Sequence, residues 1–433
     1  MKPSSSKTKI DVGVWKIFDC EKHKAEGHDI CFGINDATIY GFPILVPAKK
    51  KIIDKSKLKP FYTLGDNEAF VILGRTPPPC LYWGFTPYLH KRMYENESEY
   101  TQVNASLSDT LNHRKFQKMF QLTSPFEQPV MIIVGKNPTL NNIIYNRRYF
   151  EKLRLSTDIF NKVVIPLPAD IMRPDDLITI ISRVTYIKPD VAESYIEKPG
   201  LFCFKFTLNV NPIFLQQPLY KFAPPVPPPD LQTPNPPNFF QITRDTNINE
   251  GLVSVDSASN KTISDILQRY IQKSAQLGRR RVPVKLFSVT LNEPRFPIDL
   301  GLTCIENRYD CFFDNRDTVY SVTTPIITTD APHGIYVTGV NHVNTGKAIY
   351  TNINIYDAQQ YTPVFDLLVT QTPTPMYEKN GVFVTIKEHF YMLFIPFKFY
   401  QNLQKIFIAE RAYLQNVISS SFDTIAFPLV YLQ

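Results

Sequence analysis

Three acidic side chains surround an arginine in one short segment of this 433-residue chain. Asp310, Asp314 and Asp317 fall within eight residues, and Asn315 and Arg316 lie between the last two. Carboxylates at this spacing could bind a metal ion or act as the acid and base of a hydrolase. They could equally form a rigid turn, in which Asp and Asn side chains cap backbone amides and the arginine bridges carboxylates. Both interpretations stay open from the residues alone.

A second polar segment, GVNHVNTGKAIY at 339–350, joins two predicted strands. It brings Asn341, His342, Thr345 and Lys347 together at one end of a sheet, and loops held by a rigid scaffold often carry function. Its Gly-Lys pair does not form a phosphate-binding loop, because the glycine spacing and the residue after the lysine differ from that motif. The segment is a candidate site, with a structural loop as the alternative.

These two segments define a hydrolase hypothesis. Its candidate catalytic residues are Asp310, Asp314, Asp317, His342 and Lys347. One carboxylate would act as acid or base, and His342 would assist it. Glycosidases need two carboxylates about 5–9 Å apart across a cleft, so a carbohydrate-active enzyme is one form of this hypothesis.

An aromatic segment, LYWGFTPYLH at 81–90, has the composition of a strand. As the wall of a ligand site, Trp83 and Tyr88 would offer faces for stacking. As core, alternation places Trp83 and Phe85 on one buried face of a sheet. The candidate ligand-binding residues are Trp83, Tyr88, Asn315, Arg316, Asn341 and Thr345.

The elements that position these segments are mostly short strands, which predicts an α+β fold with a sheet or sandwich in each of two β-rich halves and a few packed helices. Expected strands lie at 13–18, 40–46, 68–73, 81–89, 129–134, 162–166, 201–210, 284–291, 318–322, 335–340, 348–356, 382–386 and 390–395. Expected helices lie at 106–120, 139–153 and 262–277, and a further helix is expected to begin at Arg173. The order strand, helix, strand over 129–166 predicts a βαβ unit.

A proline-rich stretch at 218–238 divides the chain, because its nine prolines favour an extended linker over sheet or helix. We therefore expect an irregular basic segment at 1–60, an α+β domain at 61–217 and a β-rich domain at 239–433.

The formal net charge of +7 is mild for this length. Basic residues gather at 49–59 and at 279–281, where they predict either solvated surface or a patch for nucleic acid or another polyanion. No apolar run approaches the roughly 18 residues that span a bilayer. The Ser- and Lys-rich N-terminal residues lack the apolar core of a secretory signal, so we expect a virion or cytoplasmic location.

Six cysteines show neither CxxC pairs nor zinc-finger spacing to histidine, so no metal site and no cofactor are expected. Cys304 with Cys311, and Cys20 with Cys31, could form short disulfide loops in an oxidising compartment, or remain thiols in a reducing one.

Four segments carry a resemblance to a known family: YWGFTPYL at 82–89, SLSDTLN at 106–112, DNRDTVY at 314–320 and GVNHVNTGKAIY at 339–350. With these segments the chain resembles a family of proteins from bacteria, plants and large DNA viruses that has no established activity. The resemblance spans about 73–357, and the abundance of Lys, Asn and Ile favours the viral members. It implies no catalytic residue.

Three functional hypotheses follow. The first is a structural or interaction protein with protein partners, such as a virion component, because the familiar enzyme motifs are missing. The alternative is a hydrolase or carbohydrate-active enzyme with its site at 310–320 and 339–350. The second alternative is a polyanion-binding protein that uses the basic clusters.

Overall fold

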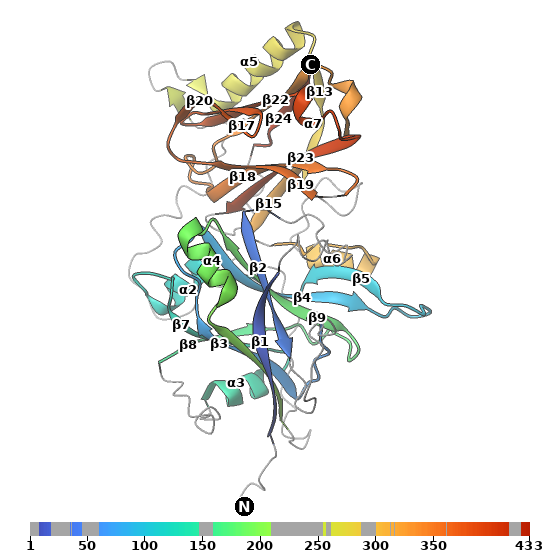
Figure 1. Ribbon diagram of the computed structural model, residues 1–433. Helices are drawn as coiled ribbons and strands as arrows, with labels where there is room; N and C mark the ends of the chain where they lie inside the picture. Colours follow the sequence, from blue (N-terminus) through green and yellow to red (C-terminus); the bar gives the residue numbers. More distant parts are fainter. Residues whose placement is uncertain are drawn as a thin grey trace, which may run out of the picture. The chain divides into compact units, whose positions relative to one another are not determined.

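The structure is a computed structural model, and the chain divides into two compact units (Figure 1). It describes residues 8–18, 35, 37–45, 60–146, 159–208, 254–256, 261–286, 300–311, 313–315, 317–360, 362–414 and 426–433. Unit 1 comprises Met1–Lys22, Ala37–Pro225 and Pro297–Asn315. Unit 2 comprises His23–Asp36, Val226–Phe296 and Arg316–Gln433. Each unit therefore draws on separate stretches of the sequence.

Unit 1 is built on one ten-stranded sheet in the order β5-β4-β9-β2-β1-β10-β3-β7-β8, with β6 paired to β4. Its strands are β1 (Thr8–Phe18), β2 (Thr38–Leu45), β3 (Glu68–Arg75), β4 (Tyr82–Arg92), β5 (Thr101–Ser106), β6 (Leu111–Asn112), β7 (Pro129–Gly135), β8 (Asn161–Pro166), β9 (Leu177–Thr185) and β10 (Leu201–Leu208). Its helices are α2 (His113–Phe120), α3 (Pro138–Asn146), α4 (Pro189–Glu197) and α6 (Leu300–Asn307). The pairing of β7 with β8 is parallel, with α3 between them in sequence, so the predicted βαβ unit is confirmed.

Unit 2 contains two six-stranded sheets. The β17 sheet has the order β13 (Arg280–Val282), β24 (Leu429–Leu432), β17 (Gly334–Val340), β22 (Phe390–Pro396), β21 (Val382–Ile386) and β20 (Thr374–Lys379). The β18 sheet has the order β14 (Val284–Leu286), β15 (Thr318–Thr323), β23 (Lys405–Leu414), β18 (Ala348–Asp357) and β19 (Thr362–Val369), with β16 (Ile326–Ile327) paired to β23. The remaining elements are the hairpin of β11 (Ser254–Asp256) and β12 (Lys261–Thr262), α5 (Ile263–Gln276), η6 (Thr328–Asp330) and α7 (Phe397–Tyr400).

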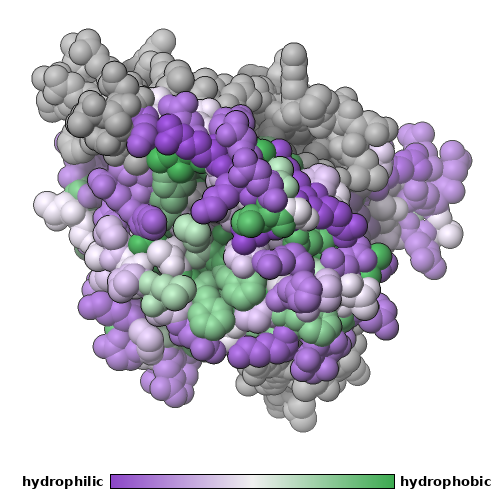
Figure 2. Space-filling model, turned by 90° about the horizontal axis from the view of Figure 1, so that it is seen from above, coloured by the Kyte–Doolittle hydropathy of each residue, from purple (hydrophilic) through white to green (hydrophobic). Residues whose placement is uncertain are grey.

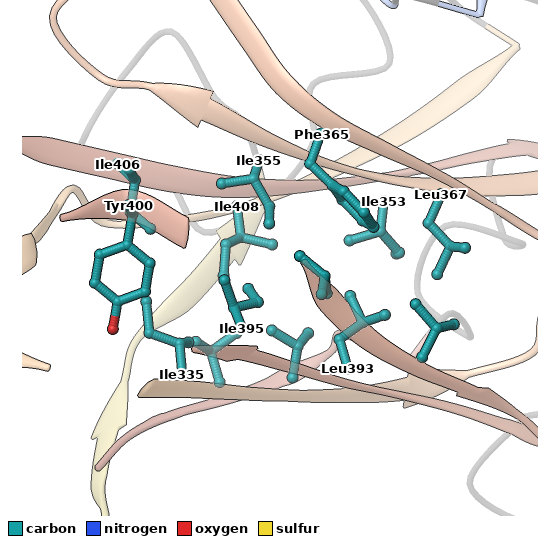
Figure 3. Packing of buried hydrophobic residues seen from close by; sticks show 14 of the residues in the cluster. Ile335, Ile353, Ile355, Phe365, Leu367, Leu393, Ile395, Tyr400, Ile406 and Ile408 are labelled. Atoms are coloured by element: carbon teal, nitrogen blue, oxygen red, sulfur yellow. The ribbon is translucent and has the colours of Figure 1, made fainter. Parts of the chain in front are cut away.

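The main core of unit 2 lies between its two sheets. Alternate residues of each strand point inward, as the pleat requires, and Figure 3 shows the two layers of side chains facing each other. The β18 sheet contributes Ile353, Ile355, Phe365, Leu367, Ile406 and Ile408, and the β17 sheet contributes Ile335, Leu393 and Ile395. Unit 2 is therefore a β-sandwich, and the prediction of β-rich halves with few helices is confirmed.

The helix α5 begins where its sequence predicts. Thr262 is the N-cap, and its hydroxyl accepts a hydrogen bond from the backbone N–H of Asp265. The Asp265 carboxylate in turn accepts one from the backbone N–H of Thr262 at 2.9 Å, which completes a capping box. From the inner face of the helix, Ile263, Ile266 and Leu267 pack against Val340 and Phe390 of the β17 sheet.

The strands expected at 13–18 and 40–46 are present as parts of β1 and β2. The expectation of a separate, mostly irregular segment at 1–60 was wrong, because β1 and β2 are inner strands of the unit 1 sheet. Their partners include β9 and β10, which lie more than a hundred residues away in sequence, so no local pattern reveals the pairing. Residues 297–315, expected in the C-terminal domain, belong to unit 1. The predicted linker at 218–238 lies outside the described residues.

Two predicted helices also differ from the structure. No helix begins at Arg173; the segment turns instead, and Asp176 accepts a hydrogen bond from the Arg173 N–H. The helix expected at 106–120 begins only at His113, because Asn112 caps it by accepting from the N–H of Lys115. Among the described residues, no helix is long and apolar enough to cross a membrane.

Candidate functional site: buried motif clusters and an exposed aromatic face

Trp83 and Tyr88, predicted to contact a ligand, are fully buried in unit 1. The Trp83 ring packs against Phe116 of α2, with ring centroids 5.5 Å apart. The Tyr88 hydroxyl accepts a hydrogen bond from Arg183 at 2.6 Å and donates one to the Asp314 carbonyl oxygen at 2.7 Å. This burial favours the packing role over the role of a ligand wall.

In the acidic segment at 310–317, Asp314 and Asn315 form side-chain hydrogen bonds to other residues of unit 1. The two carboxylate oxygens of Asp314 accept hydrogen bonds from the backbone N–H and the hydroxyl of Ser106, at 2.7 Å and 2.5 Å. Asn315 donates to the Tyr82 hydroxyl and accepts from the Thr110 hydroxyl, both at 3.2 Å. Asp314 and Asn315 therefore fasten the turn to the end of the sheet, as the structural interpretation expects. Arg316 lies outside the described residues.

Asp310 is the start of a chain of side chains that ends at a buried histidine. Its carboxylate accepts hydrogen bonds from Gln102 at 2.8 Å and from Asn104 at 3.0 Å. The Oδ1 of Asn104 lies 2.7 Å from Nδ1 of His90, so this nitrogen carries the proton in the neutral ring. The His90 ring stacks on Phe61 with centroids 3.6 Å apart. Burial disfavours the imidazolium ion and lowers the pKa of His90 to about 4.

This pKa predicts that unit 1 loses stability in mild acid. Because the folded pKa of about 4 lies below the usual value of 6.5, the unfolded state binds the proton first. The contribution of His90 is complete above pH 6.5 and is lost as the pH falls toward 4, by up to about 3 kcal/mol. Urea unfolding at pH 7, 5.5 and 4.5 should show this decline, and a His90→Phe variant should show a shallower one. An equal pH slope in the variant would assign the decline to other groups.

Within the segment 339–350 of unit 2, residues 341–347 form a compact turn between β17 and β18. Asn341 donates to the Thr370 carbonyl oxygen at 2.9 Å, and the Thr345 hydroxyl donates to the His342 carbonyl oxygen at 3.2 Å. The backbone N–H of Lys347 bonds to the same carbonyl at 3.0 Å, and the Lys347 side chain is buried. Asn341, His342, Thr345 and Lys347 all lie in this turn between β17 and β18, and their role as a site stays a prediction.

The predicted acid–histidine site is divided between the units. Asp310 and Asp314 belong to unit 1, whereas Asp317 and His342 belong to unit 2. Asp317 is buried, and its carbonyl oxygen accepts from the N–H of Leu414 at 2.8 Å. A site that joins the acidic turn to the loop stays a prediction.

The carboxylate beside His342 is Glu410 of β23, which sequence reasoning missed. Its Oε1 lies 3.4 Å from Nε2 of His342 and accepts a hydrogen bond from the Tyr391 hydroxyl at 2.7 Å. Its Oε2 accepts one from the Ser321 hydroxyl at 3.2 Å. His342 is 0% and Glu410 2% exposed, so the pair lies within unit 2 away from solvent. Burial and the Glu410 carboxylate raise the pKa of Tyr391 well above its usual value.

A signal for Glu410 exists in the sequence. Along KIFIAERAYL at 405–414, alternation from Ile406 and Ile408 places Glu410 on the inward face of the sandwich. A carboxylate at such a position needs buried donors, and Tyr391 and Ser321 supply them.

A second buried network occupies the opposite face of the β18 sheet. The Asp366 carboxylate accepts from Asn352 at 2.9 Å and from Asn354 at 3.0 Å. Arg411 donates to the side-chain oxygen of Asn354 and to the Tyr356 hydroxyl. The alternating asparagines of the sequence NIN were its only sequence signal. Most polar groups of the network are bonded within it, as is usual for buried polar groups, although Oδ1 of Asn352 has no partner among the described residues.

Cys304 and Cys311 form a disulfide in unit 1, with Cα atoms 5.9 Å apart. Cys80 and Cys203 are free thiols, and Cys20 and Cys31 lie outside the described residues. In the described part of the chain, no three His, Cys, Asp or Glu side chains are grouped as metal ligands would be.

The outer face of the β17 sheet carries a row of side chains that sequence reasoning missed. Directly paired residues on successive strands are Arg281, Tyr431, Tyr336, Phe394 and Phe383, and we call this set the aromatic row. Ring centroids are 4.7 Å apart between Tyr336 and Phe394 and 6.2 Å apart between Phe394 and Phe383. Since the neighbouring residues of these strands point into the core, the row faces away from it.

The aromatic row is covered at one end and open at the other. Tyr431 is buried beneath Tyr270 of α5, with ring centroids 5.7 Å apart. Tyr336, Phe394 and Phe383 are partly exposed. Figure 2 views unit 2 from the side that carries α5, and apolar side chains gather near the middle of this view with hydrophilic ones around them.

Comparisons with known proteins add little. No family profile matches the chain, and no curated protein does either. Among solved structures, the chain is similar to an uncharacterised protein from Burkholderia cenocepacia, at 10% identity over 98% of this chain and 81% of that chain, with a TM-score of 0.39. A similarity at this level supports no statement about function.

Proposed function

We propose that this protein is an interaction protein that binds its partners through exposed faces of its sheets, rather than an enzyme. The observation that supports this proposal is the contrast between the aromatic row, which is partly exposed, and the acid–base candidates, which are committed to internal contacts. A catalytic group must reach a reacting atom within hydrogen-bond distance or through one water. The finer proposal, that the protein is a virion component, stays a prediction.

The hydrolase alternative was placed at 310–320 and 339–350, and the structure adds Glu410, whose carboxylate lies 3.4 Å from the His342 imidazole. Both are almost completely buried, and the carboxylate already accepts hydrogen bonds from Tyr391 and Ser321. Asp314 has both oxygens bonded to Ser106. Such contacts explain why these residues are polar without requiring a substrate.

A turnover assay on the full chain tests this proposal. Ester, phosphodiester and glycoside substrates with chromogenic leaving groups should show no turnover above buffer. Any turnover should be repeated with Glu410→Gln, which keeps the shape of the side chain, after circular dichroism has shown that the variant is folded. Turnover that follows the wild-type protein through purification and disappears in folded Glu410→Gln would overturn the proposal in favour of a hydrolase.

A further inference from the structure

The aromatic row is continued by a stacked arginine. The guanidinium carbon of Arg279 lies 3.8 Å from the centroid of the Tyr336 ring, the shortest distance of this kind in the described part of the chain. A guanidinium at this distance lies on the face of the ring. Its planar group therefore extends the surface that begins with Phe383 and Phe394.

Two arginines near the Tyr336 end of the aromatic row, Arg279 and Arg281, lack a neutralising carboxylate among the described residues. Arg280 pairs with Asp330 at 2.7 Å, but neither Arg279 nor Arg281 has an ion-pair partner within the described ranges. The Nε of Arg279 also has no hydrogen-bond partner there. Unit 2 thus presents two available cations beside the aromatic rings, and Glu378, paired with Phe383, is the acidic residue at the far end.

The rings at the open end are held in place by their surroundings. Gly334 lies against Phe394, and a Cβ at this glycine would be 2.5 Å from the ring. Phe394 also lies between Tyr336 and Phe383 on the neighbouring strands. Rings that are ordered before binding lose little conformational entropy when a planar ligand stacks on them.

We propose that the outer face of the β17 sheet binds single-stranded nucleic acid. Bases would stack on Phe383, Phe394 and the guanidinium of Arg279, and backbone phosphate would approach Arg281. Aromatic side chains combined with cations are the general means of binding single strands without sequence preference. Neighbouring strands lie about 4.8 Å apart, so the open row has room for two or three bases, as on the four-stranded sheets of known RNA-binding domains.

The chemistry selects this ligand over two others. A duplex hides its base faces, so it could use the arginines but not the rings. A neutral polysaccharide could use the rings but would gain nothing from Arg279 and Arg281. Of these three ligands, a single strand is the one that uses the rings and the cations together. This inference rests on the proposed function, because it names the partner class of a binding protein.

Fluorescence anisotropy of the full chain with fluorescein-labelled oligo-dT and oligo-U of about twelve nucleotides tests the proposal, since the site sizes of such proteins are about 4–16 nucleotides. We expect binding that weakens with salt. Phe383→Leu and Phe394→Leu keep apolar bulk but remove the rings, and each should weaken binding about tenfold. For Arg281→Ala, the slope of the logarithm of the binding constant against the logarithm of the salt concentration should fall in magnitude by about one. The matched control is Phe202→Leu in unit 1, a residue that is 56% exposed, and it should leave affinity unchanged.

Four results would count against the proposal. They are no binding at low salt, equal binding of a duplex of the same length, equal losses in the Phe202 control, and ring-dependent binding of a polysaccharide without binding of oligonucleotides. Cleavage of the oligonucleotide, seen on a denaturing gel of the same samples, would instead overturn the proposed non-catalytic function. If the protein neither binds nor cleaves the oligonucleotides, the nucleic-acid proposal fails while the proposed role as a non-catalytic interaction protein is unaffected.

Discussion

Replacing Asp176 with alanine is expected to destabilise unit 1 by about 3–5 kcal/mol, because it leaves a buried arginine without its counter-ion. Asp176 accepts hydrogen bonds from Nε and Nη2 of Arg92 at 2.8 Å and 2.6 Å, a two-point contact. The side chains of Arg92 and Asp176 are 5% and 0% exposed. The remaining bond of Arg92, to the Ile171 carbonyl oxygen at 2.6 Å, cannot neutralise its charge. Urea unfolding followed by circular dichroism measures the loss.

Two further variants separate the buried charge from the lost contact. Asp330→Ala breaks the exposed pair with Arg280 and should cost about 1 kcal/mol or less. Arg92→Met combined with Asp176→Leu removes both charges and should recover much of the stability that Asp176→Ala loses. If the single Asp176 variant is no less stable than the Asp330 variant, the pair does not have the role assigned to it.

The sequence allowed much of this architecture to be predicted. Strands such as Val382–Ile386 and Phe390–Pro396 have the period-two pattern of a sheet that buries one face, so they could be located to within a residue or two. The α5 capping box and the order of strand, helix and strand around α3 are also local signals. In each case the information lies within about fifteen consecutive residues.

Long-range pairing accounts for what could not be predicted. The aromatic row exists only because Tyr431, Tyr336 and Phe394 come into register on strands that are distant in sequence. In the same way, Glu410 becomes the partner of His342 only when the two sheets of the sandwich face each other. The polar motif at Asp314 could be found in the sequence, but its role could not be decided there. A structural turn and a catalytic site use the same residue types, and only the contacts in the structure distinguish them.

Tyr391 links the two sheets of unit 2, and Gly339 makes room for it. Tyr391 lies on β22 of one sheet, and its hydroxyl donates to Glu410 on β23 of the other at 2.7 Å. A Cβ at Gly339 would lie 2.1 Å from the Tyr391 hydroxyl oxygen and 2.3 Å from the ring carbon that carries it. No atom of a buried ring can approach a methyl group so closely, so the ring must move.

Gly339→Ala is therefore expected to lower the free energy of unfolding by about 3–5 kcal/mol, since it adds the cost of overpacking to that of a buried carboxylate that loses a donor. Gly346→Ala, in the turn that follows β17, is the control: its site is open but its φ is +75°, so only backbone strain of about 1 kcal/mol applies. In a Tyr391→Leu background the hydroxyl and most of the ring are gone, so the Gly339 change should cost much less than in the wild type. Equal costs in both backgrounds would show that the two residues are not coupled and that the clash with Tyr391 is not the cause.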